Sequence, residues 1–92
     1  MTTLETLVTQ LQAARAASKA AYAAVLRSHE VSPCIDPKEN GFPCWQREEY
    51  RRGEYSLCEN CGNRIPLWDA RRETANRAGA ALRAVLRFKV QQ

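Results

Sequence analysis

The sequence predicts a mainly α-helical fold: an antiparallel two-helix hairpin, coiled-coil-like, with a central irregular insert that holds four cysteines. Two long stretches at the ends of the chain show apolar residues at alternating three- and four-residue steps, a pattern typical of packed helices. The middle contains all four cysteines, three of the four prolines and three of the four glycines. We expect a single domain, residues 1–92, made of a helix at 1–29, a zinc-binding insert at 30–65 and a basic helix at 66–90.

The first predicted helix starts with a capping pattern. Thr2 can cap it, and Glu5 stands three residues later, as in a capping box. No glycine or proline interrupts the segment that follows. Its inner stripe is Leu4, Leu7, Leu11, Ala14, Ser18, Ala21 and Val25, with Val8, Tyr22 and Leu26 widening it. Such a stripe requires a partner helix.

The second predicted helix begins at Pro66, a residue that suits a first turn. Its expected inner stripe is Trp68, Ala75, Ala78, Leu82, Val85 and Leu86. Antiparallel pairing sets the leucines of the two helices against each other and the alanines against alanines. Parallel pairing would set leucines against alanines. The sequence therefore favours the antiparallel hairpin.

The insert contains the cysteines at the spacing C-x9-C-x13-C-x2-C, at Cys34, Cys44, Cys58 and Cys61. Two thiolates three residues apart can bind one tetrahedral ion from a tight turn, and Gly62 permits positive φ after them. Four cysteines complete a closed zinc site, and such sites contribute folding energy directly. A site in which His29 replaces one cysteine, disulfides, and free thiols remain alternatives, and iron remains an alternative to zinc.

Charge is concentrated at the C-terminal end of a chain whose net charge is +4. Residues 66–92 hold six basic and two acidic side chains. A basic helix suits contact with nucleic-acid phosphates or an acidic protein, and also serves simply as a solvated face. The candidate contact residues are Arg71, Arg72, Arg77, Arg83, Arg87 and Trp45. Trp45 has local packing beside the metal site as its alternative role.

No catalytic residues are expected, and we interpret the protein as a non-enzyme. One histidine, no glycine-rich phosphate loop and a closed metal site leave no evident place for substrate chemistry. No stretch approaches a membrane span, and the N-terminus lacks a secretory pattern, so no membrane contact is expected. We expect a cytoplasmic location, in a bacterial host, where clustered cysteines point to metal rather than disulfides.

The segment from Cys58 to Pro66, with Arg71 and Arg72 after it, resembles the first half of the zinc finger in the DksA/TraR family. That resemblance implies a zinc site and action on bacterial RNA polymerase. It covers about fifteen of the 92 residues, and the family's second, downstream Cys-x-x-Cys is absent, with Cys34 and Cys44 upstream instead. The acidic coiled-coil tip of DksA has no counterpart. Over its whole length the layout looks like small proteins carried by bacteriophages and prophages.

These observations predict a non-enzymatic zinc-binding accessory or regulatory protein, encoded by a phage, that binds a host or phage protein such as transcription machinery or a defence system. One alternative is a nucleic-acid-binding zinc-finger regulator that uses the basic C-terminal helix. Another is a structural or assembly component. A homodimer built through exposed Val8, Leu26 or Phe88 is also open, because a chain of this length has a thin core.

Overall fold

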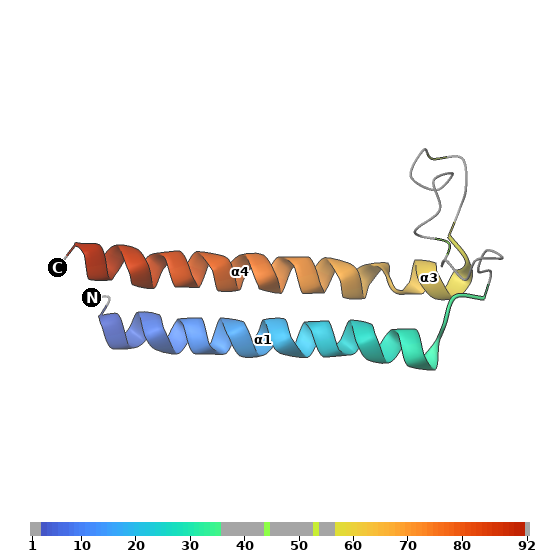
Figure 1. Ribbon diagram of the computed structural model, residues 1–92, viewed down its shortest axis with the longest axis horizontal. Coiled ribbons are helices and arrows are strands. Elements are labelled where there is room, and N and C mark those ends of the chain that lie inside the picture. Colours follow the sequence, from blue (N-terminus) through green and yellow to red (C-terminus); the bar gives the residue numbers. More distant parts are fainter. Residues whose placement is uncertain (1–2, 36–43, 45–52, 54–56, 92) are drawn as a thin grey trace.

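The computed structural model describes residues 3–35, 44, 53 and 57–91. Within these ranges the chain forms three helices, α1 (Leu4–Val31), α3 (Glu59–Asn63) and α4 (Ile65–Val90), and no strand. Helices α1 and α4 lie side by side and run in opposite directions, with both chain ends at one end of the pair and α3 at the other (Figure 1). This arrangement confirms the predicted mainly α antiparallel hairpin with a cysteine cluster between its helices.

Helix α1 begins one residue later than predicted. Its N-cap is Thr3, whose side-chain oxygen accepts a hydrogen bond from the Thr6 backbone N–H at 3.1 Å, so the assignment of Thr2 as the cap is wrong. The helix also continues past residue 29 to Val31. It stops at Ser32 because the following residue is Pro33, which disfavours helical backbone in the residue before it.

The start of α4 agrees with the sequence pattern, but the turn before it does not. Pro66 lies in the first turn of α4, as expected for a residue without a backbone N–H. Gly62, which we expected at positive φ, lies inside the short helix α3, and Gly53 is the one positive-φ glycine in the described ranges. The chain thus passes from the cysteine pair into α4 by helical turns.

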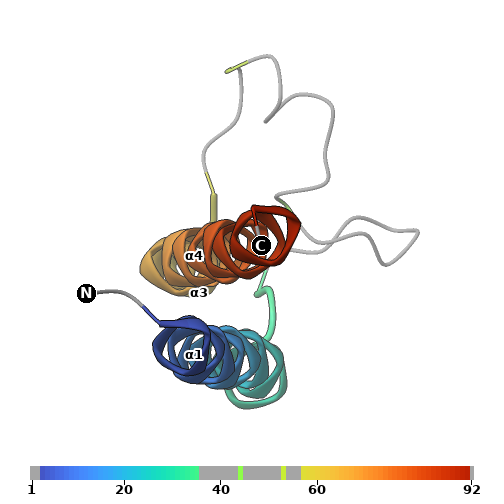
Figure 2. The same cartoon turned by 90° about the vertical axis from the view of Figure 1, so that its left-hand side faces the viewer.

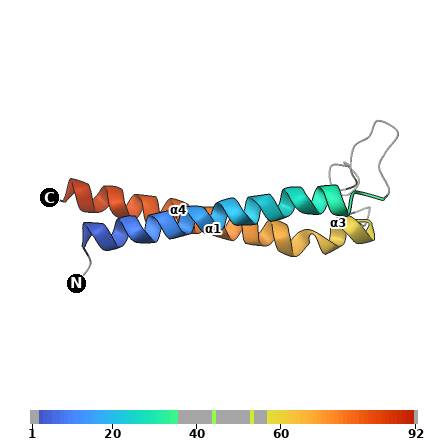
Figure 3. The ribbon, with the colours of Figure 1, turned by 90° about the horizontal axis from the view of Figure 1, so that it is seen from below.

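The contact between α1 and α4 is a narrow seam (Figure 3 shows the shallow crossing). On α1 the central stripe from Leu4 to Val25 is confirmed, since Leu11 and Val25 are buried and its other members are half-buried. Of the residues expected to widen it, Val8 is half-buried, whereas Tyr22 and Leu26 are exposed. On α4 only Val85 is buried, at 5% exposure. The seam of α4 is completed by the half-buried residues Leu67, Thr74, Ala78, Ala81 and Phe88.

The predicted register of α4 is therefore partly wrong. Ala75, Leu82 and Leu86 were expected in the stripe, but all three are exposed, Leu86 by 51%. The observed seam follows alternating steps of four and three residues from Leu67. It passes through Ala81 instead of Leu82, and through Val85 instead of Leu86. Small side chains at Ala78 and Ala81 let the helices approach closely, which places the leucines beside the seam rather than in it.

Two helices alone can each bury only one side, as the end-on view in Figure 2 makes clear for α1 and α4. Tyr22 and Leu26 on α1 remain nearly half exposed, like Leu86 on α4. Of the residues predicted to form a dimer, Leu26 is exposed, whereas Val8 and Phe88 are half-buried.

The seam predicts that truncating Val85 lowers the stability of the protein more than truncating its neighbour Leu86. We expect Val85→Ala to lower the free energy of unfolding by about 1–2 kcal/mol, after allowing for the better helix propensity of alanine. Leu86→Ala should cost less than about 1 kcal/mol, because half of that side chain is already in water. Urea unfolding followed by circular dichroism measures both. A larger loss of stability for Leu86→Ala than for Val85→Ala would support the register predicted from sequence instead.

Candidate metal centre

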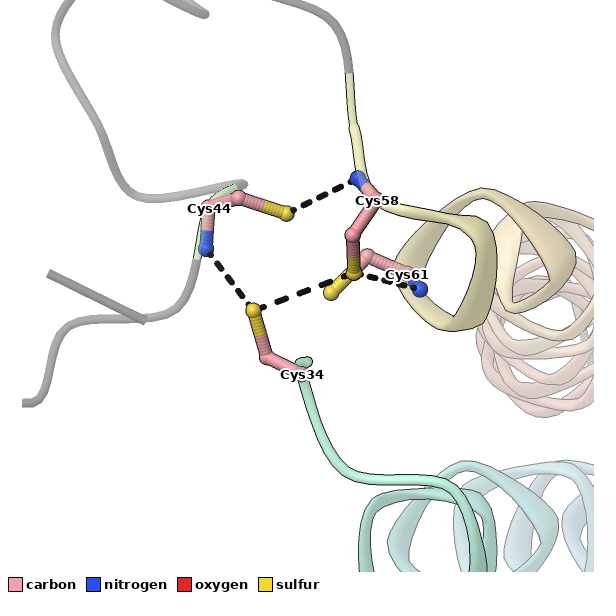
Figure 4. A group of neighbouring side chains, drawn as sticks. All are labelled: Cys34, Cys44, Cys58 and Cys61. Atoms are coloured by element: carbon pink, nitrogen blue, oxygen red, sulfur yellow. Dashed lines mark hydrogen bonds between the residues drawn. The ribbon is translucent and has the colours of Figure 1, made fainter. Parts of the chain in front are cut away.

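The four cysteines converge at the end of the hairpin where α1 stops and α3 begins (Figure 4). Their Sγ atoms all lie within 4.8 Å of one another. Cys34 follows α1 by three residues, Cys58 is the N-cap of α3, and Cys61 lies inside α3. Cys44 and Cys61 are fully buried, while Cys34 and Cys58 are half-buried. Three separate parts of the chain thus meet at one point.

Helix α3 sets the spacing of its two cysteines. The Cys58 sulfur accepts a hydrogen bond from the backbone N–H of Cys61 at 3.4 Å, in the position of an N-cap side chain. The Cys58 carbonyl accepts from the N–H of Gly62 at 2.8 Å. This turn holds both sulfurs on the side of α3 that faces Cys34 and Cys44.

The distances fit a metal site and not disulfides. All four cysteines are free, and the Sγ atoms of Cys34 and Cys58 are 3.9 Å apart, far beyond the roughly 2.05 Å of a disulfide. A tetrahedral ion with metal–sulfur bonds of about 2.3 Å requires sulfurs about 3.8 Å apart. His29 is not part of the cluster, so the ligand set with a histidine finds no support among the described residues.

Each sulfur accepts at least one N–H hydrogen bond. The backbone N–H of Cys44 donates to Cys34, that of Cys58 to Cys44, and that of Cys61 to Cys58, each with a nitrogen–sulfur distance of 3.4 Å. The fourth sulfur, on Cys61, accepts instead from the guanidinium NH1 of Arg64 at 3.5 Å. Donors of this kind stabilise thiolates, the form of cysteine that binds metals.

Two side chains tie the cluster to the end of α1. Arg64 is 1% exposed, and its Nε donates to the Ser28 hydroxyl at 3.0 Å, while its NH2 group donates to the carbonyls of Ser28 and Ser32. Asn60 donates from its amide to the Pro33 carbonyl at 2.9 Å. Sequence reasoning assigned neither residue a role. One feature of the sequence could have indicated that Arg64 is buried. Arg64 lies three residues before Leu67, so it continues the four-and-three spacing of the α4 seam at a position where a packed helix normally has an apolar residue.

The surroundings shift the pKa values of Cys44, Cys58 and Cys61 in different directions. Burial alone would raise the pKa of Cys58, but backbone N–H donors from Cys61 and Ile35 lower it to about 6. Burial and neighbouring thiols raise the pKa of Cys61, and burial raises that of Cys44. Burial, followed by the charge of Arg64, lowers the pKa of His29. Four thiolates in one place need a bound cation to balance their charge.

The residues predicted to contact a partner are not gathered at this site. Arg71 stacks over the Tyr22 ring, 4.6 Å from its centroid, and Arg72 and Arg77 form ion pairs with Asp69 and Glu73. Arg83 and Arg87 are exposed on α4. Trp45 lies outside the described residues.

No protein-family model, curated protein or solved structure matches this chain. Within the described ranges, neither long helix has an apolar stretch sufficient to cross a membrane. The chemistry of the four sulfurs is therefore the guide to what the site does. Four sulfur ligands complete a tetrahedral coordination sphere, which leaves no position for water or substrate.

The cluster predicts a single metal per chain with four sulfur ligands. Titration of the reduced protein with cobalt(II) should give the visible absorption of a tetrahedral thiolate complex and saturate at one equivalent. Cys61→Ser should reduce this absorption or abolish it. His29→Ala, the matched control, should leave the spectrum and the stoichiometry unchanged. A spectrum that depends on His29 would contradict the four-sulfur ligand set.

Proposed function

We propose that the protein is a zinc-binding module in which the metal has a structural role. The observation that supports the proposal is the approach of four sulfurs within 4.8 Å, contributed by segments on both sides of the hairpin. A tetrathiolate site that fills all four positions is typical of structural zinc. Zinc bound to Cys34, Cys44, Cys58 and Cys61 would close the open end of α1 and α4.

The closed ligand set favours a non-enzymatic role. We propose an accessory or regulatory protein, encoded by a phage and acting in the bacterial cytoplasm, that binds a host or phage protein. Bulky side chains that the hairpin leaves exposed support a protein partner. Tyr22 and Leu26 on α1, and Leu82 and Leu86 on α4, each lie four residues apart, so each pair shares one side of its helix.

Nucleic-acid binding by the basic helix is less favoured. Arg72 and Arg77 are already paired with carboxylates, and Arg71 is stacked on an aromatic ring. These contacts reduce the positive charge that α4 offers to phosphates. Transcription machinery and defence proteins, rather than DNA, are therefore the partners we propose, and an assembly role for the hairpin is the remaining alternative.

The structural role of the metal predicts a large effect of chelation. Elemental analysis of the reduced, purified protein should find one zinc per chain. Removing it with a chelator should lower stability by at least about 2 kcal/mol, or about 10 °C in Tm for a domain of this size. Cys34→Ser should unfold at the lower temperature with or without chelator. Heat stability that does not respond to chelation would rule out the structural role.

Whether the partner is a protein or a nucleic acid can be tested by capture from a bacterial lysate, in parallel with and without nuclease treatment. We expect the zinc-loaded protein to retain a defined protein partner, and Leu82→Glu/Leu86→Glu to lose it, because charges on that side prevent apolar contact. Thr9→Glu, an exposed position on α1, is the matched control and should retain the partner.

Retention that disappears after nuclease treatment would support the nucleic-acid alternative instead. In that case affinity for random duplex DNA at about 50 mM salt should fall steeply by about 200 mM. No retained partner under either condition would contradict both forms of binding.

A further inference from the structure

Arg64 is a buried cation. Its side chain is 1% exposed, and no acidic residue among those that the structure describes forms an ion pair with it. A charge removed from water needs an opposite charge or a full set of hydrogen bonds. In the described part of the chain, the atoms that Arg64 contacts provide them.

Those atoms belong to two parts of the molecule. NH1 faces the Cys61 sulfur, whereas Nε and NH2 face the Ser28 hydroxyl and the carbonyls of Ser28 and Ser32. The carbonyls lie at the C-terminal end of α1, where the helix dipole is negative. The Ser28 carbonyl also accepts from the backbone N–H of Ser32. One guanidinium thus bridges the cysteine cluster and the end of α1.

The bond to Cys61 is the exception among the donors to the sulfurs. Cys34, Cys44 and Cys58 accept from backbone N–H groups of other cysteines in the cluster, whereas Cys61 accepts from a charged side chain. Hydrogen bonds with an ionised donor and an ionised acceptor are the strong ones. A metal-bound cysteine is a thiolate, so with metal in the site the contact between Arg64 and Cys61 is of this strong kind.

We propose that Arg64 is a positioning residue that couples occupancy of the metal site to closure of the hairpin. The inference rests on the proposed metal site. With metal bound, the Cys61 thiolate provides the negative charge that holds the guanidinium in place, and the guanidinium holds the end of α1. Without metal the Cys61 sulfur is no longer fixed beside the guanidinium, so Arg64 loses one side of its bridge and the last turn of α1 opens.

The geometry also explains why arginine occupies this position. The guanidinium uses three nitrogens to reach four acceptors on both sides of it. Lysine keeps the charge but concentrates its donors on a single nitrogen, so it cannot span the same acceptors. Arg64→Lys therefore separates the effect of charge from the effect of shape.

The experiment compares wild type, Arg64→Met, Arg64→Lys and Arg83→Met. Arg83 is an exposed arginine on α4, and its variant serves as the matched control. Each protein is loaded with cobalt(II) for spectroscopy and with zinc for affinity, measured by competition with a chelator. Hydrogen exchange is followed at the Ser32 amide, which donates to the Ser28 carbonyl at 2.8 Å and reports on the end of α1.

We expect both Arg64 variants to shift the sulfur-to-cobalt charge-transfer band to lower energy, since the Cys61 sulfur loses a donor. Arg64→Met should bind zinc about 10-fold to 100-fold more weakly, the usual effect of losing a partner of a metal ligand. In wild type and Arg83→Met, zinc should slow exchange at Ser32 by about 10-fold or more, and in Arg64→Met it should not.

Unchanged band energy, zinc affinity and zinc-dependent protection of Ser32 in Arg64→Met would overturn the proposal. If Arg64→Met does not fold, an unshifted band in Arg64→Lys would overturn it equally. Failure of the metal site itself has a different signature, because the wild type would then take up no stoichiometric cobalt or zinc.

Discussion

The structure depends on the gathering of four sulfur atoms at the end of the hairpin opposite the chain termini. The seam between α1 and α4 has only three buried apolar side chains, Leu11, Val25 and Val85, so it contributes limited stability along a pair of helices about 40 Å long. The cluster at the far end brings together the segment after α1, Cys44 and helix α3. A bound cation there would do what a longer apolar core does in a larger domain.

The hydrogen bonds around the sulfurs connect this cluster to the helices. Backbone N–H groups and one guanidinium donate to the four sulfurs, and Asn60 fixes the segment that carries Cys34. The same Arg64 also donates to the carbonyls of Ser28 and Ser32 at the end of α1. Side-chain hydrogen bonds therefore join the cysteine cluster directly to the helix pair.

The surface of the hairpin follows from its single seam. A pair of helices covers one side of each, so Tyr22, Leu26, Leu82 and Leu86 stay largely accessible. The arginines of α4 are partly engaged by Asp69, Glu73 and Tyr22, which weakens the electrostatic case for a nucleic-acid surface. The exposed apolar side chains are the physical basis for proposing a protein partner.

The amino-acid sequence by itself determined the helices, their antiparallel order and the set of four cysteines. These depend on local quantities, namely the three- and four-residue spacing of apolar side chains, Pro33 and Pro66, and the residue types that bind metal. Only the tertiary structure decided which face of α4 meets α1, because Ala81 and Leu82 are adjacent and either spacing yields an apolar stripe. It also decided that Arg64 is buried, since the acceptors that surround it come from residues 28, 32 and 61, which no local pattern in the sequence relates to one another.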